Sequence, residues 1–178
     1  MKGLKDTLLY LVEIFFITKY YKTMKRLTEE EIFNLSKTDK LRYEILLKVI
    51  DTYTLKNRGI QGGSFNMCVY YDRETKNCCA VGMIVRDYTD MSVEKFSDLY
   101  NTIGSIDNIM NHLSNSGFDT EYPDLLMKLD YKFLEDLQTL HDTVGHWDSS
   151  GFNESKGTTV SFVNSLRPIP AIIIDAPS

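Results

Sequence analysis

The chain has 178 residues, of which 43% are hydrophobic and 25% are charged, a composition typical of a single globular domain with a buried core. A formal net charge of −5 at pH 7 gives no general attraction to phosphate backbones, so nonspecific nucleic-acid binding is disfavoured. Three cysteines are an odd number in a chain too long to depend on disulfides, which favours a reducing compartment.

The N-terminal segment carries an apolar run, LLYLVEIFFI at 8–17, which contains one carboxylate, Glu13. The run is about half as long as the roughly 20 residues of a membrane span, and no small-residue cleavage site follows it. We therefore expect no membrane span and an amphipathic helix over 1–23, as an extension of the domain. A peripheral membrane- or partner-binding helix and a targeting segment remain as alternatives.

Two helices are expected next. Thr28 and Glu31 have the spacing of a capping box, which predicts a short helix from residue 29. A second helix is expected to begin at Thr38 or Asp39. Its apolar stripe, in helical spacing, is Leu41, Ile45, Val49 and Tyr53.

A hairpin is predicted in the middle of the chain. Three glycines at 59–63 end the helical pattern, and SFNMCVYY at 64–71 has the composition of a strand. After a polar turn at 72–77, the run CCAVGMIV at 78–85 either returns as an antiparallel strand or continues as a helix. Both alternatives stay open here, and the predicted fold class is α+β, a mostly helical single domain with a small antiparallel β-hairpin.

The second half is expected to be helical, with starts at Ser92 and Ser105, Pro123 in a first turn, a long helix over 131–144 and a last helix capped by Asn153. Its prolines predict that 167–178 is an extended tail or edge strand. The predicted domain therefore spans 24–166, with 1–23 and 167–178 outside it.

Cys79 and His141 are the candidates for nucleophilic catalysis. A helix N-terminus lowers the pKa of a thiol, and a helix that begins near Cys78 or Cys79 would create this situation. His141 is the candidate base, with Gln138 expected to orient its ring better than the adjacent Asp142, which diverges from it on a helix. Plain core packing of both thiols is the alternative, and the usual burial of cysteine favours it.

Zinc binding is a further alternative. Cys68 with Cys78 or Cys79, and His141 with His146, would supply four ligands for a tetrahedral site. The chain has no C-x-x-C pair, and we expect neither a metal nor a cofactor.

The segment that follows the long helix holds the single tryptophan. Phe133, Leu137, Leu140 and Val144 form the expected buried stripe of this helix, with His141 half exposed beside it. Trp147 either anchors a partner or, more commonly, closes the end of a core. The candidate binding residues are Cys68, Tyr70, Gly82, Trp147 and Asp148.

Three sequence blocks carry a family resemblance: C-x-Y, C-A-V-G, and L-Q-x-x-H-D followed by W-D-x-x-G. The matching positions are Cys68 and Tyr70; Cys79, Ala80, Val81 and Gly82; Leu137, Gln138, His141 and Asp142; and Trp147, Asp148 and Gly151. With these blocks, residues 45–157 resemble a group of small accessory proteins of tailed bacteriophages. The group has no established activity, so the resemblance implies a setting, the cytoplasm of an infected host, in which such proteins disable host enzymes or defence systems by binding.

Two functions are therefore expected to compete. The first is a non-enzymatic accessory protein that binds a host protein or a small nucleotide signal, in host takeover or counter-defence. The second is a cysteine-dependent hydrolase or transferase that uses Cys79 and His141. In both cases Cys79, Gly82, His141 and Trp147 are expected to meet in space. A homo-oligomer is left open.

Overall fold

The computed structural model describes residues 24, 26–58, 60–61, 67–100, 106, 108–109 and 123–169, with 60–61 and 67–68 described by their backbone alone. The predicted N-terminal helix over 1–23 and residues 170–178 of the predicted tail lie outside these residues. The bounds of the predicted domain, 24–166, therefore stay a prediction. The α-helices of the described part are α2 (Glu29–Phe33), α3 (Lys37–Thr52), α4 (Ala80–Tyr88), α5 (Val93–Tyr100), α7 (Asp124–Lys128), α8 (Tyr131–Asp142) and α9 (Gly157–Leu166).

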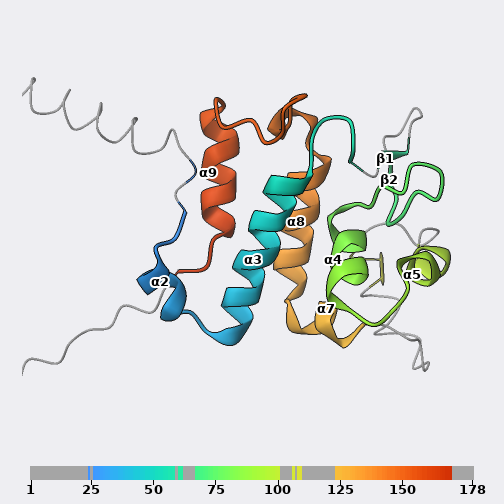
Figure 1. Ribbon diagram of the computed structural model, residues 1–178, viewed down its shortest axis with the longest axis horizontal. Coiled ribbons are helices and arrows are strands. Elements are labelled where there is room, and N and C mark those ends of the chain that lie inside the picture. Colours follow the sequence, from blue (N-terminus) through green and yellow to red (C-terminus); the bar gives the residue numbers. More distant parts are fainter. Residues whose placement is uncertain are drawn as a thin grey trace, which may run out of the picture.

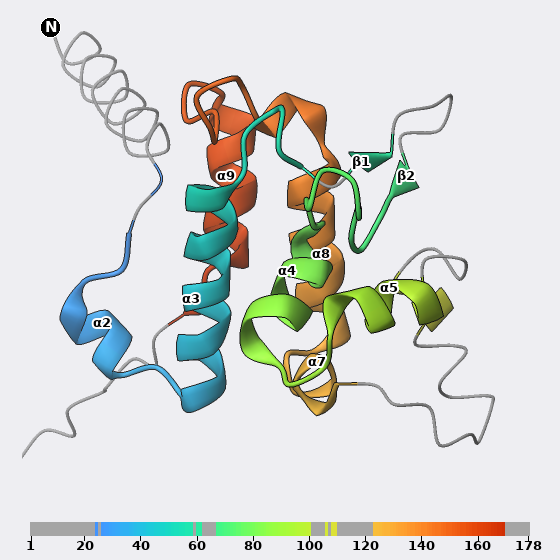
Figure 2. The same ribbon diagram turned by 45° about the vertical axis from the view of Figure 1, so that its right-hand side comes forward.

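Helix α8 is the centre of the packing. It contacts α3, α4, α7 and α9, and Figures 1 and 2 show α3 and α9 running alongside it while α4 lies against it from the other side. Three of its apolar side chains, Leu134, Leu137 and Leu140, are almost completely buried. Burial of one such side chain contributes about 1.5–3 kcal/mol, so the contacts of α8 with its four neighbours contribute substantially to stability.

Local capping signals fix the first two helices. Thr28 and Glu31 form the predicted capping box at the start of α2, with Glu31 N–H donating to the Thr28 hydroxyl and Thr28 N–H donating to the Glu31 carboxylate. Helix α3 begins one residue before the predicted start, because Ser36 is the cap and accepts from the N–H of Asp39 at 3.1 Å.

The predicted α+β class is wrong, because residues 80–88 form helix α4 rather than the second strand of a hairpin. Strand pairing in the described part is limited to two residues each of β1 (Ile60–Gln61) and β2 (Met67–Cys68), and no sheet covers the core there. The described part is therefore a helical fold. Every residue from Ala80 to Val85 is buried, so this part of α4 is apolar on all sides and lacks the 3.6-residue alternation that distinguishes a helix from a buried strand.

The turn before α4 has the predicted polar character. Asp72 N–H donates to the carbonyl of Asn77 at 2.8 Å, and the carboxylate of Asp72 accepts from the backbone of Glu74 and Thr75. An isolated antiparallel bridge joins Tyr71 to Cys78 at the base of this turn. The turn thus reverses the chain as expected, but the segment that leaves it enters a helix.

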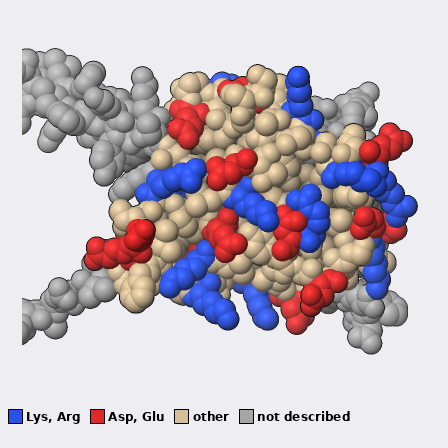
Figure 3. Space-filling model, viewed as in Figure 1, with Lys and Arg blue, Asp and Glu red and all other residues tan. Residues whose placement is uncertain are grey.

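Charges of both signs are mixed over the surface in Figure 3, and neither sign forms one continuous patch on the face shown. Lys48 of α3 pairs with Asp87 of α4 at 2.8 Å, which connects the two helices, and Arg86 pairs with the same carboxylate at 2.6 Å. Among the helices of the described part, none is long and apolar enough to cross a lipid bilayer.

We expect Gly82→Ala to destabilise the protein strongly. A Cβ atom at Gly82 would lie 1.8 Å from the backbone carbonyl oxygen of Tyr70, so α4 and the segment before the turn must separate. The expected loss is at least about 2 kcal/mol in the free energy of unfolding, measured by urea denaturation. Gly157→Ala is the matched control, because a Cβ there meets nothing within 4 Å, and its effect should be neutral or stabilising by up to about 1 kcal/mol.

Candidate functional site

The C-terminal end of α8 carries the candidate His141, Asp142 and Gln138. The Nδ1 atom of His141 lies 2.7 Å from Oδ1 of Asp142, and the side-chain amide of Gln138 donates to the same oxygen at 2.8 Å. The expectation that Gln138 would orient the ring better than Asp142 is wrong, because Asp142 contacts the ring and Gln138 contacts Asp142. Asp142 is the last residue of α8, and its carboxylate folds back onto the ring of the preceding residue.

His141 is completely buried, where a half-exposed border position was expected. Burial lowers its pKa from the usual 6.5, against the opposing effect of the hydrogen bond to Asp142. The imidazole is therefore neutral near pH 7. A carboxylate oxygen can only accept, so the proton of the neutral ring is on Nδ1 and Nε2 has the lone pair.

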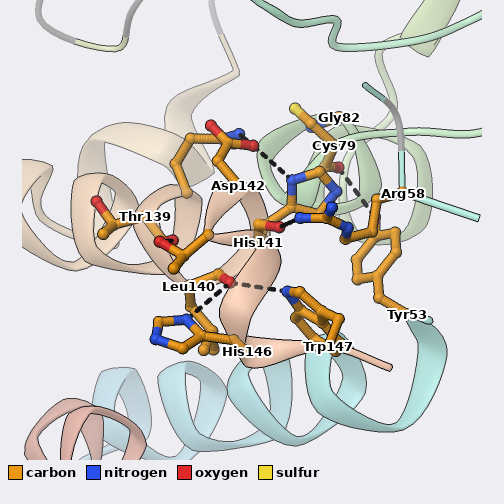
Figure 4. A network of polar contacts seen from close by, with 12 residues as sticks. Tyr53, Arg58, Cys79, Gly82, Thr139, Leu140, His141, Asp142, His146 and Trp147 are labelled. Carbon is orange, nitrogen blue, oxygen red and sulfur yellow. Dashed lines mark hydrogen bonds and ion pairs between the residues drawn. The ribbon is translucent and has the colours of Figure 1, made fainter. Parts of the chain in front are cut away.

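The last carbonyl groups of α8 have no hydrogen-bond donors within the helix. Side chains from other segments donate to them instead. Arg58 donates from Nη1 to the carbonyl of His141 at 2.6 Å, while the indole of Trp147 donates to that of Leu140 at 3.0 Å (Figure 4). His146 Nδ1 also lies 3.3 Å from the Leu140 oxygen. Arg58 adds a positive charge at the negative end of the helix dipole.

Tyr53 connects the candidate residues, and we call Tyr53, Cys79, His141 and Trp147 the junction. The Tyr53 hydroxyl donates to the carbonyl of Cys79 at 3.1 Å. Its ring meets the ring of His141 edge to face, with centroids 4.7 Å apart, and that of Trp147 at 6.1 Å. Figure 4 shows Gly82 beside Cys79 in the same group, so these expected neighbours do lie in one region, with Tyr53 between them.

Cys79 is the N-cap of α4, and its Sγ accepts a hydrogen bond from the N–H of Gly82 at 3.4 Å. Its side chain is completely buried. The sulfur makes no hydrogen bond with His141 in the described part, since Nε2 of His141 has no partner there. Cys78 is also buried, and burial raises the pKa of its thiol to about 11, although Arg86 lies 3.6 Å from the sulfur. Neither thiol has the exposure of a reactive nucleophile.

The remaining candidate binding residues make structural contacts of their own. Asp148 lies in a loop, where its carboxylate accepts from Ser150 and Gly151, and these bonds lower its pKa. Tyr70 is buried and packs on Phe96 with ring centroids 5.0 Å apart. The side chain of Cys68 lies outside the described residues.

No group of three or more His, Cys, Asp or Glu side chains that could hold a metal ion occurs among the described residues. The four-ligand zinc site proposed from the sequence therefore has no counterpart there. His146 packs instead on Phe162, with nearly parallel rings and centroids 5.5 Å apart.

Sequence reasoning missed the parts played by Arg58 and Tyr53. Tyr53 was expected only in an apolar stripe, although a tyrosine that is 3% exposed needs a partner for its hydroxyl. Arg58 is 7% exposed, which is rare for an arginine. Its pairing with a carbonyl 83 residues away has no local signal in the sequence.

A separate feature lies at the other end of α8. We call it the Arg42 groove, a depression of about 230 Å³ lined by Asp39, Arg42, Asp130, Lys132, Phe133, Asp136, Ser165, Leu166, Arg167 and Pro168. Its charges are largely paired with one another. Arg42 lies 3.4 Å from Asp39 and 3.5 Å from Asp130, and Lys132 lies 2.6 Å from Asp136.

No protein-family model matches this chain, and neither a curated protein nor a solved structure matches it.

We expect acid to destabilise the fold through His141. The folded state keeps the ring neutral because burial lowers its pKa below 6.5, whereas the unfolded chain takes up a proton as the pH falls through 6.5. The free energy of unfolding should therefore fall below that pH, by at most about 1.4 kcal/mol per pH unit, until the folded ring is protonated too. Urea denaturation of the wild type and of His141→Gln between about pH 7.5 and about pH 5 measures this. If the free energy of unfolding falls equally steeply with pH in both proteins, His141 is not the group responsible.

We expect both thiols at 78–79 to be inert in the native protein. They are buried, and the pKa of Cys78 is raised to about 11, so little thiolate forms near neutral pH. Labelling with a mild thiol reagent at about pH 8, followed by peptide mapping, separates these residues from Cys68. Labelling of the unfolded chain is the control and should be complete. Fast native labelling of Cys79 at neutral pH would contradict the structural role.

Proposed function

We propose that this chain is a non-enzymatic binding protein that captures a protein partner. The observation that carries the proposal is the use of the candidate catalytic groups in holding the fold. Cys79 caps α4, Asp142 holds the ring of a buried histidine, and Trp147 caps α8. Each of these polar contacts has a structural purpose that needs no substrate.

The cysteine-dependent enzyme is the weaker candidate. A nucleophilic thiol needs a base within hydrogen-bond reach and a path for the substrate. The Cys79 thiol is completely buried and hydrogen-bonded to Gly82. His141 has the orienting carboxylate that a base needs, but its free nitrogen is buried as well.

The Arg42 groove favours a polypeptide over a nucleotide. Its volume of about 230 Å³ is below the roughly 300–1,000 Å³ of pockets for drug-sized ligands. Asp39, Asp130 and Asp136 lie among its cations, so phosphate groups would meet carboxylates at short range. A side chain and a short backbone segment of a partner fit such a small depression, with Phe133 and Leu166 as its apolar floor and paired charges at its rim.

The resemblance to phage accessory proteins supports the choice of partner. It suggests a host protein in the cytoplasm of an infected bacterium, and host takeover or counter-defence as the purpose. The acidic net charge of −5 is consistent with a protein target rather than nucleic acid.

Comparative capture tests the proposal. The full chain is immobilised as wild type, as Ser165→Trp and as Lys132→Glu, which fill or recharge the groove, and is exposed to lysate of bacterial cells. Ser165 is exposed and lines the groove. Recovery of the same partner should fall about tenfold or more in both groove variants.

Two matched controls accompany this experiment. Ser161→Trp adds the same ring to an exposed position of α9 that is not among the groove residues, and Lys56→Glu makes the same charge change in the exposed turn after α3. Both should retain the partner, with circular dichroism confirming that all variants fold. Equal recovery by all five proteins, or release of a bound nucleotide without any protein, contradicts the proposal.

A further inference from the structure

Two buried polar atoms near the junction have no hydrogen-bond partner within the described part of the chain: Nε2 of His141 and Nε of Arg58. An unsatisfied buried donor or acceptor costs about 1–3 kcal/mol, and native proteins pair most such groups with protein or ordered water. His141 and Arg58 are joined by a hydrogen bond. Their unpaired nitrogens therefore point to a common partner.

The two atoms are complementary. The carboxylate of Asp142 holds the proton of His141 on Nδ1, which makes Nε2 an acceptor. Gln138 donates to the same carboxylate oxygen and fixes it. Arg58 Nε carries a hydrogen at every ordinary pH and is a donor. The missing partner must therefore donate to one atom and accept from the other.

Neighbouring polar groups are already committed elsewhere. The Tyr53 hydroxyl donates to the carbonyl of Cys79, Arg58 Nη1 donates to that of His141, and the Trp147 indole donates to that of Leu140. Figure 4 shows the guanidinium of Arg58 beside the imidazole of His141, on the side where Tyr53 lies. None of these donors is directed at Nε2.

The chemistry of the surroundings restricts the ligand further. A cation at Nε2 would face the guanidinium of Arg58, and no set of three metal-ligating side chains surrounds it among the described residues. A fully deprotonated anion, such as a carboxylate, has no hydrogen to donate to the lone pair. A neutral group with both a donor and an acceptor satisfies both atoms.

We infer that a small neutral molecule bridges His141 Nε2 and Arg58 Nε, donating a hydrogen bond to the first and accepting one from the second. Water has this chemistry, and so has a small organic molecule with a hydroxyl or primary amide group. This site lies at the C-terminal end of α8 and does not depend on the Arg42 groove or on the proposed function. The bound molecule is buried inside the folded protein, because both nitrogens are buried.

A high-resolution crystal structure of the full chain is the direct test. Electron density within about 3 Å of both nitrogens is the expected result. Native mass spectrometry of the same preparation separates the two sources: the chain mass alone assigns the density to water, and an additional mass released on unfolding assigns it to an organic molecule. An empty space between the two nitrogens overturns the inference.

A stability comparison provides a second test. His141→Phe keeps a ring but removes both nitrogens, whereas Asp142→Ala keeps Nε2 and removes the carboxylate that accepts from Nδ1 and from Gln138. With an occupant at Nε2, the folding equilibrium constant of the Phe variant should be about tenfold or more below that of the Ala variant. If Nε2 is unpaired, removal of a buried orphan acceptor costs little, and a Phe variant as stable as the Ala variant overturns the inference. Should the Phe variant not fold, the crystallographic test decides alone.

Discussion

The structure depends on how the C-terminal end of α8 is satisfied inside the protein. A helix ends with carbonyl groups that have no partner in the next turn, and water cannot reach them where the end is buried. Here Trp147 donates to the carbonyl of Leu140 and Arg58 to that of His141. These donors come from segments before and after α8, so the caps also hold those segments against it.

These contacts at helix ends explain the presence of the residue types that first suggested a catalytic site. Histidine, aspartate and cysteine are the usual groups of a nucleophilic site, but each also makes directional hydrogen bonds at a helix end. Cys79 does so at the start of α4 and accepts from Gly82. His141 lies under the ring of Tyr53, whose hydroxyl reaches the Cys79 carbonyl. Cys79, His141 and Trp147 thus belong to one interhelical joint around Tyr53.

The two ends of α8 have different surroundings. Helix α8 has 12 residues, and at about 1.5 Å per residue its ends lie about 18 Å apart. The junction and its unpaired nitrogens are buried at one end, whereas the Arg42 groove opens to solvent at the other. A partner in the groove can therefore bind without disturbing the buried joint, which fits a stable scaffold with an external binding surface.

The sequence by itself determined the features that act over a few residues. The capping box of Thr28 and Glu31 and the burial of Leu137 and Leu140 follow from local spacing, because a backbone donor three residues away and a 3.6-residue period are properties of the helix alone. Only the tertiary structure decided that residues 80–88 are a helix and that Asp142 holds the ring of His141. It also decided that Arg58 caps α8 from 83 residues away. An apolar run buried on every side has no period to reveal its conformation, and the partner of a buried polar group is chosen by which segments the packing brings together.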